Sequence, residues 1–199
     1  MQNTIITIAR MYGSGGRTIG KLLAKELGVP YYDRNLIYLA HEKSGIDISL
    51  FSQNDETVGS ANIPDEMGRY ISKKNIFEQQ KHIIRTVADK SDCVIVGRCA
   101  DHILKNGKHK LLRVFVHAPD DFCIKKIKNK FSITDREAEK MFRQINLHRE
   151  DYYKYHTGAE WDCAKNYDLC FDTSLYSIDD AVNAIKNYKE ILCNNRLVN

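Results

Sequence analysis

The sequence has no long apolar run. No uninterrupted hydrophobic stretch among its 199 residues approaches the length that a transmembrane helix needs. The segment Met1-Gln2-Asn3-Thr4 leads into a strand-like run without the basic region, apolar core or cleavage site of a signal peptide. With 43% hydrophobic and 28% charged residues, the composition is that of an ordinary globular protein. We therefore expect a cytoplasmic protein that does not cross a membrane.

Paired metal ligands are also missing from the sequence. There are six cysteines, but no two of them form a C-x-x-C pair, and no histidine has a second histidine at H-x-x-x-H spacing. These absences argue against a zinc site of the common types. We expect reduced thiols, mostly buried, and a metal ion only where a bound nucleotide brings one.

A large excess of charge of one sign is absent as well. The 30 basic and 26 acidic residues give a formal net charge of +4, which fits a small anionic substrate better than a nucleic-acid surface. No internal repeat or low-complexity segment divides the chain, so residues 1–199 are expected to form a single domain. The sequence does not indicate an oligomeric state.

What the chain does contain is an alternation of strand-like and helix-like segments. Apolar runs rich in β-branched residues predict strands, and stretches with helical periodicity predict helices between them. This alternation is typical of α/β proteins, in which helices cover a parallel sheet. The predicted strands are Thr4–Ile8, Cys93–Val96, Leu112–His117 and Tyr167–Phe171, with a further short one at Tyr31, and the predicted helices are Thr18–Leu27, Arg34–Lys43, Gly68–Lys90, Asp120–Lys130, Asp135–Tyr153 and Ile178–Leu192.

A glycine-rich turn follows the first predicted strand. It contains Gly13, Gly15 and Gly16, whose backbone N–H groups are free of side-chain crowding and can converge on anionic oxygens. The helix predicted from Thr18 points its positive dipole end at the same place. The turn therefore predicts a phosphate-binding loop made of Gly13, Ser14, Gly15, Gly16, Arg17 and Thr18.

This loop departs from the P-loop pattern G-x-x-x-x-G-K-[ST] at two positions. Met11 stands in place of the first glycine, and Arg17 stands in place of the lysine. A guanidinium group grips phosphate as a planar fork, whereas the lysine ammonium is a compact point charge. The alternative is a glycine-rich connection with an exposed arginine. The β-branched strand before the loop and the apolar helical stripe after it favour phosphate binding.

Several segments resemble the cytidylate kinase-like family, a branch of the P-loop nucleoside monophosphate kinases. The resemblance extends over nearly the whole chain, and an arginine in the loop is characteristic of this branch. It implies the three-layer α/β/α fold of P-loop NTPases with a five-stranded parallel sheet, an acceptor-binding insertion at residues 46–90 and a lid at residues 131–162. The segments that carry it are Arg10–Arg17, Pro30–Arg34, Val96–Arg98, Tyr152–Gly158 and Asn166–Leu169.

The resemblance also implies roles for individual residues. Arg17 would bridge the donor and the transferring phosphoryl group, Arg149 would close from the lid as the second catalytic residue, and Thr18 would touch Mg²⁺. The residues implied on the acceptor side also have purely structural interpretations. Arg98 could instead cap a carbonyl group or pair with Asp101, and Asp33 could be a helix N-cap. The implied acceptor-binding residues are Asp33, Arg34, Arg98 and Tyr153.

The predicted lid departs from its relatives at one position. Kinases of this group usually carry Asp-x-x-Arg there, and this chain has Asn146 in place of the aspartate that precedes Arg149. Without that carboxylate, the orientation of Arg149 would depend on other groups, such as Glu150 or Asp151. The alternative for the whole stretch is an amphipathic surface helix.

The leading hypothesis is an ATP-dependent cytidylate kinase that transfers the γ-phosphoryl group to CMP or dCMP with Mg²⁺. Its partners would be small nucleotides, without nucleic acid or membrane. Two alternatives remain open at this point. One is a P-loop kinase that acts on another small acceptor. The other is a nucleotide-binding regulator with little kinase activity, which would account for the departures at Met11, Arg17 and Asn146.

Overall fold

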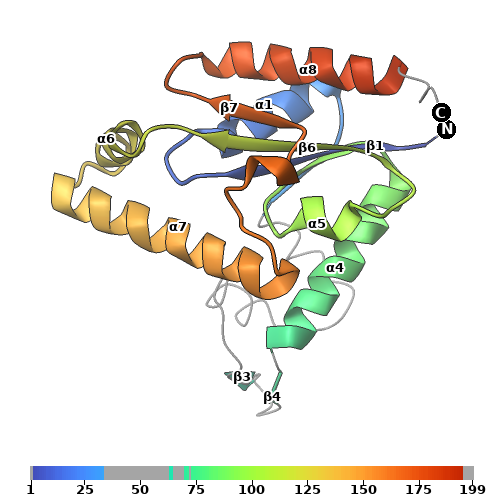
Figure 1. Cartoon of the computed structure of the whole chain (residues 1–199), viewed down its shortest axis with the longest axis horizontal. Coiled ribbons are helices and arrows are strands. Elements are labelled where there is room, and N and C mark those ends of the chain that lie inside the picture. The colour runs from blue at the N-terminus through green and yellow to red at the C-terminus, as the bar shows by residue number, and fades with distance from the viewer. Residues whose placement is uncertain (1, 34–62, 65–69, 72, 195–199) are drawn as a thin grey trace.

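The computed structural model describes residues 2–33, 63–64, 70–71 and 73–194 (Figure 1). Arg34, the helix predicted at 34–43 and most of the predicted insertion before residue 73 lie outside the described residues. Within the described part of the chain, no helix is long and apolar enough to span a membrane.

The core of the fold is one parallel sheet of five strands. In space they are ordered β2-β5-β1-β6-β7, so the first strand of the chain lies at the centre. This arrangement confirms the predicted α/β class and the five-stranded parallel sheet. The strands are β1 (Thr4–Arg10), β2 (Tyr31–Tyr32), β5 (Cys93–Val96), β6 (Lys110–His117) and β7 (Leu169–Asp172).

Helices cover both faces of this sheet, because successive strand residues point to opposite sides. Ile6 and Ile8 of β1 pack on the face that carries α1 (Gly16–Leu27) and α8 (Ile178–Asn194). Ile5 and Ala9 of the same strand point to the other face. Figure 1 shows α1 and α8 on one side of the sheet and α4 and α5 on the other. The chain therefore forms three layers.

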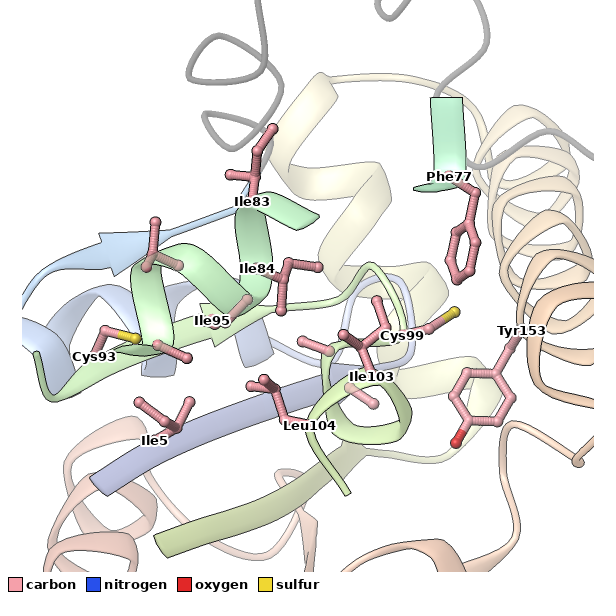
Figure 2. Close-up of a cluster of buried hydrophobic side chains, with 14 of the residues drawn as sticks. Ile5, Phe77, Ile83, Ile84, Cys93, Ile95, Cys99, Ile103, Leu104 and Tyr153 are labelled. Atoms are coloured by element: carbon pink, nitrogen blue, oxygen red, sulfur yellow. The ribbon is translucent and has the colours of Figure 1, made fainter. Parts of the chain in front are cut away.

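The second face is closed by α4 (Lys73–Lys90) and α5 (Ala100–Leu104). Ile84 of α4 and Leu104 of α5 pack with Ile5 and Ile95 from the sheet in one buried cluster. Figure 2 shows this cluster. The part of the predicted insertion that forms α4 thus contributes to the core. The short helix α5 was not predicted, since five residues are too few to show a helical period.

Connections at the carboxyl end of the sheet leave in opposite directions. The chain leaves β1 towards α1 on one face, while it leaves the neighbouring β5 towards α5 on the other face. A crevice opens where adjacent strands diverge in this way, and α/β proteins bind their ligands there. The loop after β1 and the turn after β5 therefore border one site.

Two further helices, α6 (Asp120–Phe131) and α7 (Asp135–Thr157), pack against each other next to the sheet, and Figure 1 shows α6 end-on and α7 lengthwise. Cys123 and Ile127 of α6 pack with Ala138 and Phe142 of α7. The helix predicted from Asp135 begins with a full capping box, in which Thr134 and Glu137 make reciprocal bonds. The predicted lid is therefore built largely from one long helix.

The far end of α7 packs on α4 through aromatic rings. His156 stacks on Phe77 with ring centroids 3.8 Å apart and meets Tyr152 edge-on at 4.5 Å. The Tyr152 hydroxyl donates to Oε1 of buried Gln80 at 2.8 Å. Burial lowers the pKa of His156 to about 4, so the imidazole is neutral in this contact near neutral pH.

His156 should make stability depend on pH. Its pKa in the unfolded chain, about 6.5, exceeds the folded value of about 4, so its contribution is complete above pH 6.5 and is lost as pH falls towards 4. After allowance for partial exposure, we expect a loss on the order of 1 kcal/mol across this window. Urea unfolding at several pH values should show a flatter dependence for His156→Phe than for the parent or for His148→Gln, a matched change at an exposed histidine. Equal pH slopes in all three would contradict the assignment.

Candidate active site

The glycine-rich loop connects the central strand to a helix whose N-terminus is uncapped. Gly13 and Gly15 have φ of 86° and 88°, in the left-handed region that favours glycine. Gly15 occupies the N-cap position of α1 and offers no side chain to bond the first N–H groups of the helix. Among the described residues, no acceptor is bonded to the N–H of Gly15 or Gly16. These amides are available to an anion.

Gly13 also permits a close approach between the loop and α6. A Cβ atom at this position would lie 2.7 Å from the carbonyl oxygen of Cys123, which is shorter than real Cβ contacts. The loop therefore packs backbone against backbone on α6, and only glycine fits there.

We expect Gly13→Ala to destabilise the protein by about 2–4 kcal/mol, because positive φ and the contact with Cys123 both penalise the methyl group. Gly28→Ala is the matched control, since Gly28 has φ of 65° but would place its Cβ in open space. Chemical denaturation should give a clearly larger loss for Gly13→Ala than for Gly28→Ala. Equal losses would show that the contact with α6 carries no cost.

A cavity of about 510 Å³ opens above the loop. This volume is within the roughly 300–1,000 Å³ usual for small-molecule sites. Among the described residues, its lining carries one acidic side chain, that of Asp33, and a group of basic side chains from β1, α1, the turn after β5, α6 and α7. Such a cavity attracts an anion with several charges. The basic lining residues are Arg10, Arg17, Arg98, Lys126, Lys130 and Arg149.

Arg17 and Asp33, both predicted as site residues, form an ion pair at the cavity wall. The Arg17 Nε donates to Asp33 Oδ2 at 2.6 Å, and the Tyr31 hydroxyl donates to the same oxygen at 2.9 Å. Burial opposes the charge on Arg17, but the hydrogen bond and charge of Asp33 outweigh it and raise the pKa of Arg17. Because a guanidinium has five N–H donors, this pair orients Arg17 and leaves donors for a ligand.

Arg98 lies in the turn that follows β5, across the crevice from the loop. Its φ is 61°, and that of the next residue, Cys99, is 53°, so two consecutive non-glycine residues adopt the left-handed region. Such a backbone is strained by about 1–3 kcal/mol per residue, and strain of this kind clusters at ligand sites. The Arg98 side chain is buried yet lines the cavity. The turn thus holds a buried guanidinium group at the site.

Arg149 reaches the site from α7. Its Nη1 donates to the carbonyl oxygen of Arg10 at 3.0 Å, and its guanidinium carbon lies 5.6 Å from the centre of the Tyr12 ring. One turn earlier on α7, Asn146 Oδ1 accepts from the Tyr12 backbone N–H at 2.8 Å. Asn146 therefore bonds the loop itself, and Arg149 is oriented by Arg10 and Tyr12.

Tyr153 lies behind the cavity wall. Its side chain is buried, and its hydroxyl donates to Asp101 Oδ2 at 2.6 Å. Burial, together with the charge of Asp101, raises the pKa of Tyr153. Burial likewise raises the pKa of Asp101, although the bond from Tyr153 opposes this. The two side chains form a buried pair that adjoins Arg98 and Arg149 without lining the main cavity.

Three of the basic residues in the cavity were not predicted as site residues. Arg10 ends β1, and Lys126 and Lys130 lie four residues apart on α6. The i,i+4 spacing of the two lysines places them on one helix face, which the sequence could have indicated. What it could not indicate is that this face turns towards the loop, because that depends on how α6 packs on α7.

A magnesium ion would find few protein ligands here. Of the lining residues that the structure describes, Thr18 offers an aliphatic hydroxyl oxygen and Asp33 a carboxylate. Among the described residues, no group of three His, Cys, Asp or Glu side chains could hold a metal ion. Mg²⁺ keeps several waters and takes much of its shell from phosphates, so this small donor set fits a nucleotide-bound ion.

Strand order, glycine-rich loop and cationic cavity together define a P-loop kinase fold. A solved structure agrees with this description. Shikimate kinase from Bacteroides thetaiotaomicron superposes with a TM-score of 0.56 over 94% of this chain and 98% of the other, at 16% identity. Likeness at that identity shows the fold alone.

Residues 5–175 match the cytidylate kinase-like family, and the chain belongs to it. The cytidylate kinase of Methanocaldococcus jannaschii is 25% identical over 185 residues, which cover 92% of this chain and 96% of that protein. The predicted resemblance is thus confirmed, and with it a nucleotide kinase class of protein.

Another relative is a much larger protein. The S-adenosylmethionine-dependent nucleotide dehydratase of Lacinutrix mariniflava is 26% identical over 187 residues, or 92% of this chain. The match spans only 35% of that protein's length. This chain is therefore also similar to one part of a longer protein that is named for a different activity.

Proposed function

We propose that the protein transfers the γ-phosphoryl group of ATP to CMP or dCMP, with Mg²⁺ bound to the donor. The observation that carries the proposal is the cavity in which a glycine-rich helix N-terminus meets six basic side chains, counted over the described residues, from five separate elements. A kinase of this type must neutralise two phosphate chains at once, so it needs this excess of positive charge.

The half of the cavity that would bind the phosphate donor is formed by the glycine-rich loop and Arg17. Amides at Gly15 and Gly16 would bind the β- and γ-phosphates, since no acceptor among the described residues is bonded to them. Arg17, oriented by Asp33, would bridge the β-phosphate and the transferring group. Thr18 would hold Mg²⁺, which would supply positive charge to the donor phosphates.

The half of the cavity that would bind the phosphate acceptor is formed by the turn after β5. Arg98 would grip the acceptor monophosphate as a bidentate fork, because its buried position excludes water and strengthens the contact. Asp33 and Arg34 would border the same nucleotide, and residues 46–90 would supply its base contacts. The buried Tyr153 and Asp101 pair would act from behind the wall beside Arg98.

The transfer step needs no side-chain base. An acceptor phosphate oxygen is already an anion, so it can attack the γ-phosphorus directly while the leaving ADP oxygen departs in line. The γ-phosphoryl group disperses charge over its oxygens in the transition state. Arg149 from the lid at 131–162 would stabilise that charge, and Arg17 would do so from the loop.

A coupled assay that measures ADP release with CMP, dCMP, UMP, AMP and GMP tests the proposal. We expect turnover with the two cytidine nucleotides to exceed that with each of the others. No turnover with any of them would contradict the kinase proposal. A preference for another base would contradict the cytidine assignment and identify a different acceptor nucleotide. Tight ATP binding without transfer would favour the nucleotide-binding regulator instead.

A further inference from the structure

One buried hydroxyl group connects the last strand to the glycine-rich loop. Thr173 directly follows β7, and its side chain is 4% exposed. Its Oγ1 donates to the carbonyl oxygen of Ser14 at 2.7 Å, with a longer approach of 3.2 Å to the carbonyl of His117. The backbone N–H of Thr173 already satisfies His117 at 2.9 Å. The main hydrogen bond of the Thr173 hydroxyl is therefore the one to the Ser14 carbonyl oxygen in the loop.

This bond fixes the orientation of one peptide group. The carbonyl of Ser14 and the N–H of Gly15 belong to the same trans peptide, so they point in opposite directions. Ser14 is fully buried and does not line the cavity, whereas Gly15 does. Holding the Ser14 carbonyl on Thr173 therefore turns the Gly15 N–H towards the cavity.

Without such a bond, the peptide between Ser14 and Gly15 could rotate. A peptide flip changes φ of the second residue by about 180°, which would take Gly15 from its φ of 88° to a negative value. Glycine adopts both signs of φ with similar ease, so Gly15 itself does not resist the flip. In the flipped form a carbonyl oxygen would face the anion site and repel phosphate.

We propose that Thr173 is a positioning residue for phosphate binding, whose hydroxyl holds the Ser14–Gly15 peptide with its N–H directed at the donor phosphates. The inference rests on the proposed function, because it assumes that the loop binds a nucleoside triphosphate. Thr173 itself touches no ligand. It acts by holding a carbonyl group that would otherwise be free to enter the site.

Isothermal titration with inorganic tripolyphosphate and with ATP, in the presence of Mg²⁺, tests this role. We expect Thr173→Val to bind both ligands about tenfold more weakly, since it keeps the side-chain shape but cannot hold the Ser14 carbonyl. The KM for ATP should rise by a similar factor, with kcat at saturating ATP changed much less, because the ligand itself restores the peptide orientation on binding.

Two further variants separate positioning from packing. Thr173→Ser keeps the hydroxyl and should retain the parent affinity within about twofold. Ser174→Ala removes the neighbouring hydroxyl, which bonds Asp172 at 2.7 Å, and should leave affinity unchanged. A melting temperature measured for each variant reports any loss of stability separately from binding.

Three results would overturn the role of Thr173. The first is a folded Thr173→Val that binds tripolyphosphate as the parent does, even with a lowered melting temperature. The second is a Thr173→Ser that loses affinity, which would assign the effect to the methyl group and would decide the matter if Thr173→Val did not fold. The third is a parent protein that binds neither ATP nor tripolyphosphate, which would contradict the proposed function first and this role with it.

Discussion

Replacing Arg17 by methionine is expected to lower kcat/KM for CMP phosphorylation by about 10³-fold, the largest loss that the site predicts for one side chain. Arg17 is the cation of the loop. It is the second residue of α1 and lies at the positive end of the helix dipole. Methionine keeps the length of the side chain but removes its charge and all its donors. Because the lost contact is strongest in the transition state, kcat should fall more than ATP affinity.

Lys21→Met is the matched control for this variant. Lys21 lies one turn further along α1 and does not line the main cavity, so its loss should leave kcat/KM within about twofold. Arg17→Lys gives a second comparison. If lysine at position 17 retains full activity, the planar guanidinium fork that pairs with Asp33 is not specifically required.

The second large effect is expected at Arg98. Arg98→Met should lower kcat/KM for the acceptor by on the order of 10²-fold, because a buried charged contact to phosphate is lost. The effect should appear mainly as a raised KM for CMP, while the affinity for ATP measured by titration should be close to that of the parent. This split would separate the acceptor half of the cavity from the donor half.

Arg85→Met, at an exposed arginine on α4, is the control, and we expect it to change neither constant. Arg98→Lys should fall between the parent and Arg98→Met, since an ammonium keeps the charge but not the planar fork. An Arg98→Met variant that weakens ATP binding as much as CMP binding would contradict the assignment of this residue to the acceptor.

The sheet could be predicted from the sequence because its strands are short apolar runs with clear ends. All five strands were expected within two residues of their observed limits, including the short one at Tyr31. The resemblance to a known family implied the same number of strands. The short helix α5 was not predicted, because its five residues show no period.

The candidate site was predictable where it follows the chain and unpredictable where it depends on packing. Loop residues and Arg98 stand at strand ends, which parallel sheets bring to one edge. The ion pair of Arg17 with Asp33 joins residues that were each expected near a nucleotide, but their contact depends on the place of β2 beside β5. The hydrogen bond from Thr173 to Ser14 joins residues that are 159 positions apart, so no local sequence pattern predicts it.

The central claim is that the cavity carries out phosphoryl transfer between two nucleotides. Incubation with [γ-³²P]ATP, Mg²⁺ and CMP, followed by separation of the nucleotides, tests it most directly. The proposed function predicts labelled CDP in an amount equal to the ADP formed, and almost none with Arg17→Met. Label that remains in ATP, or that appears only as inorganic phosphate, would contradict it.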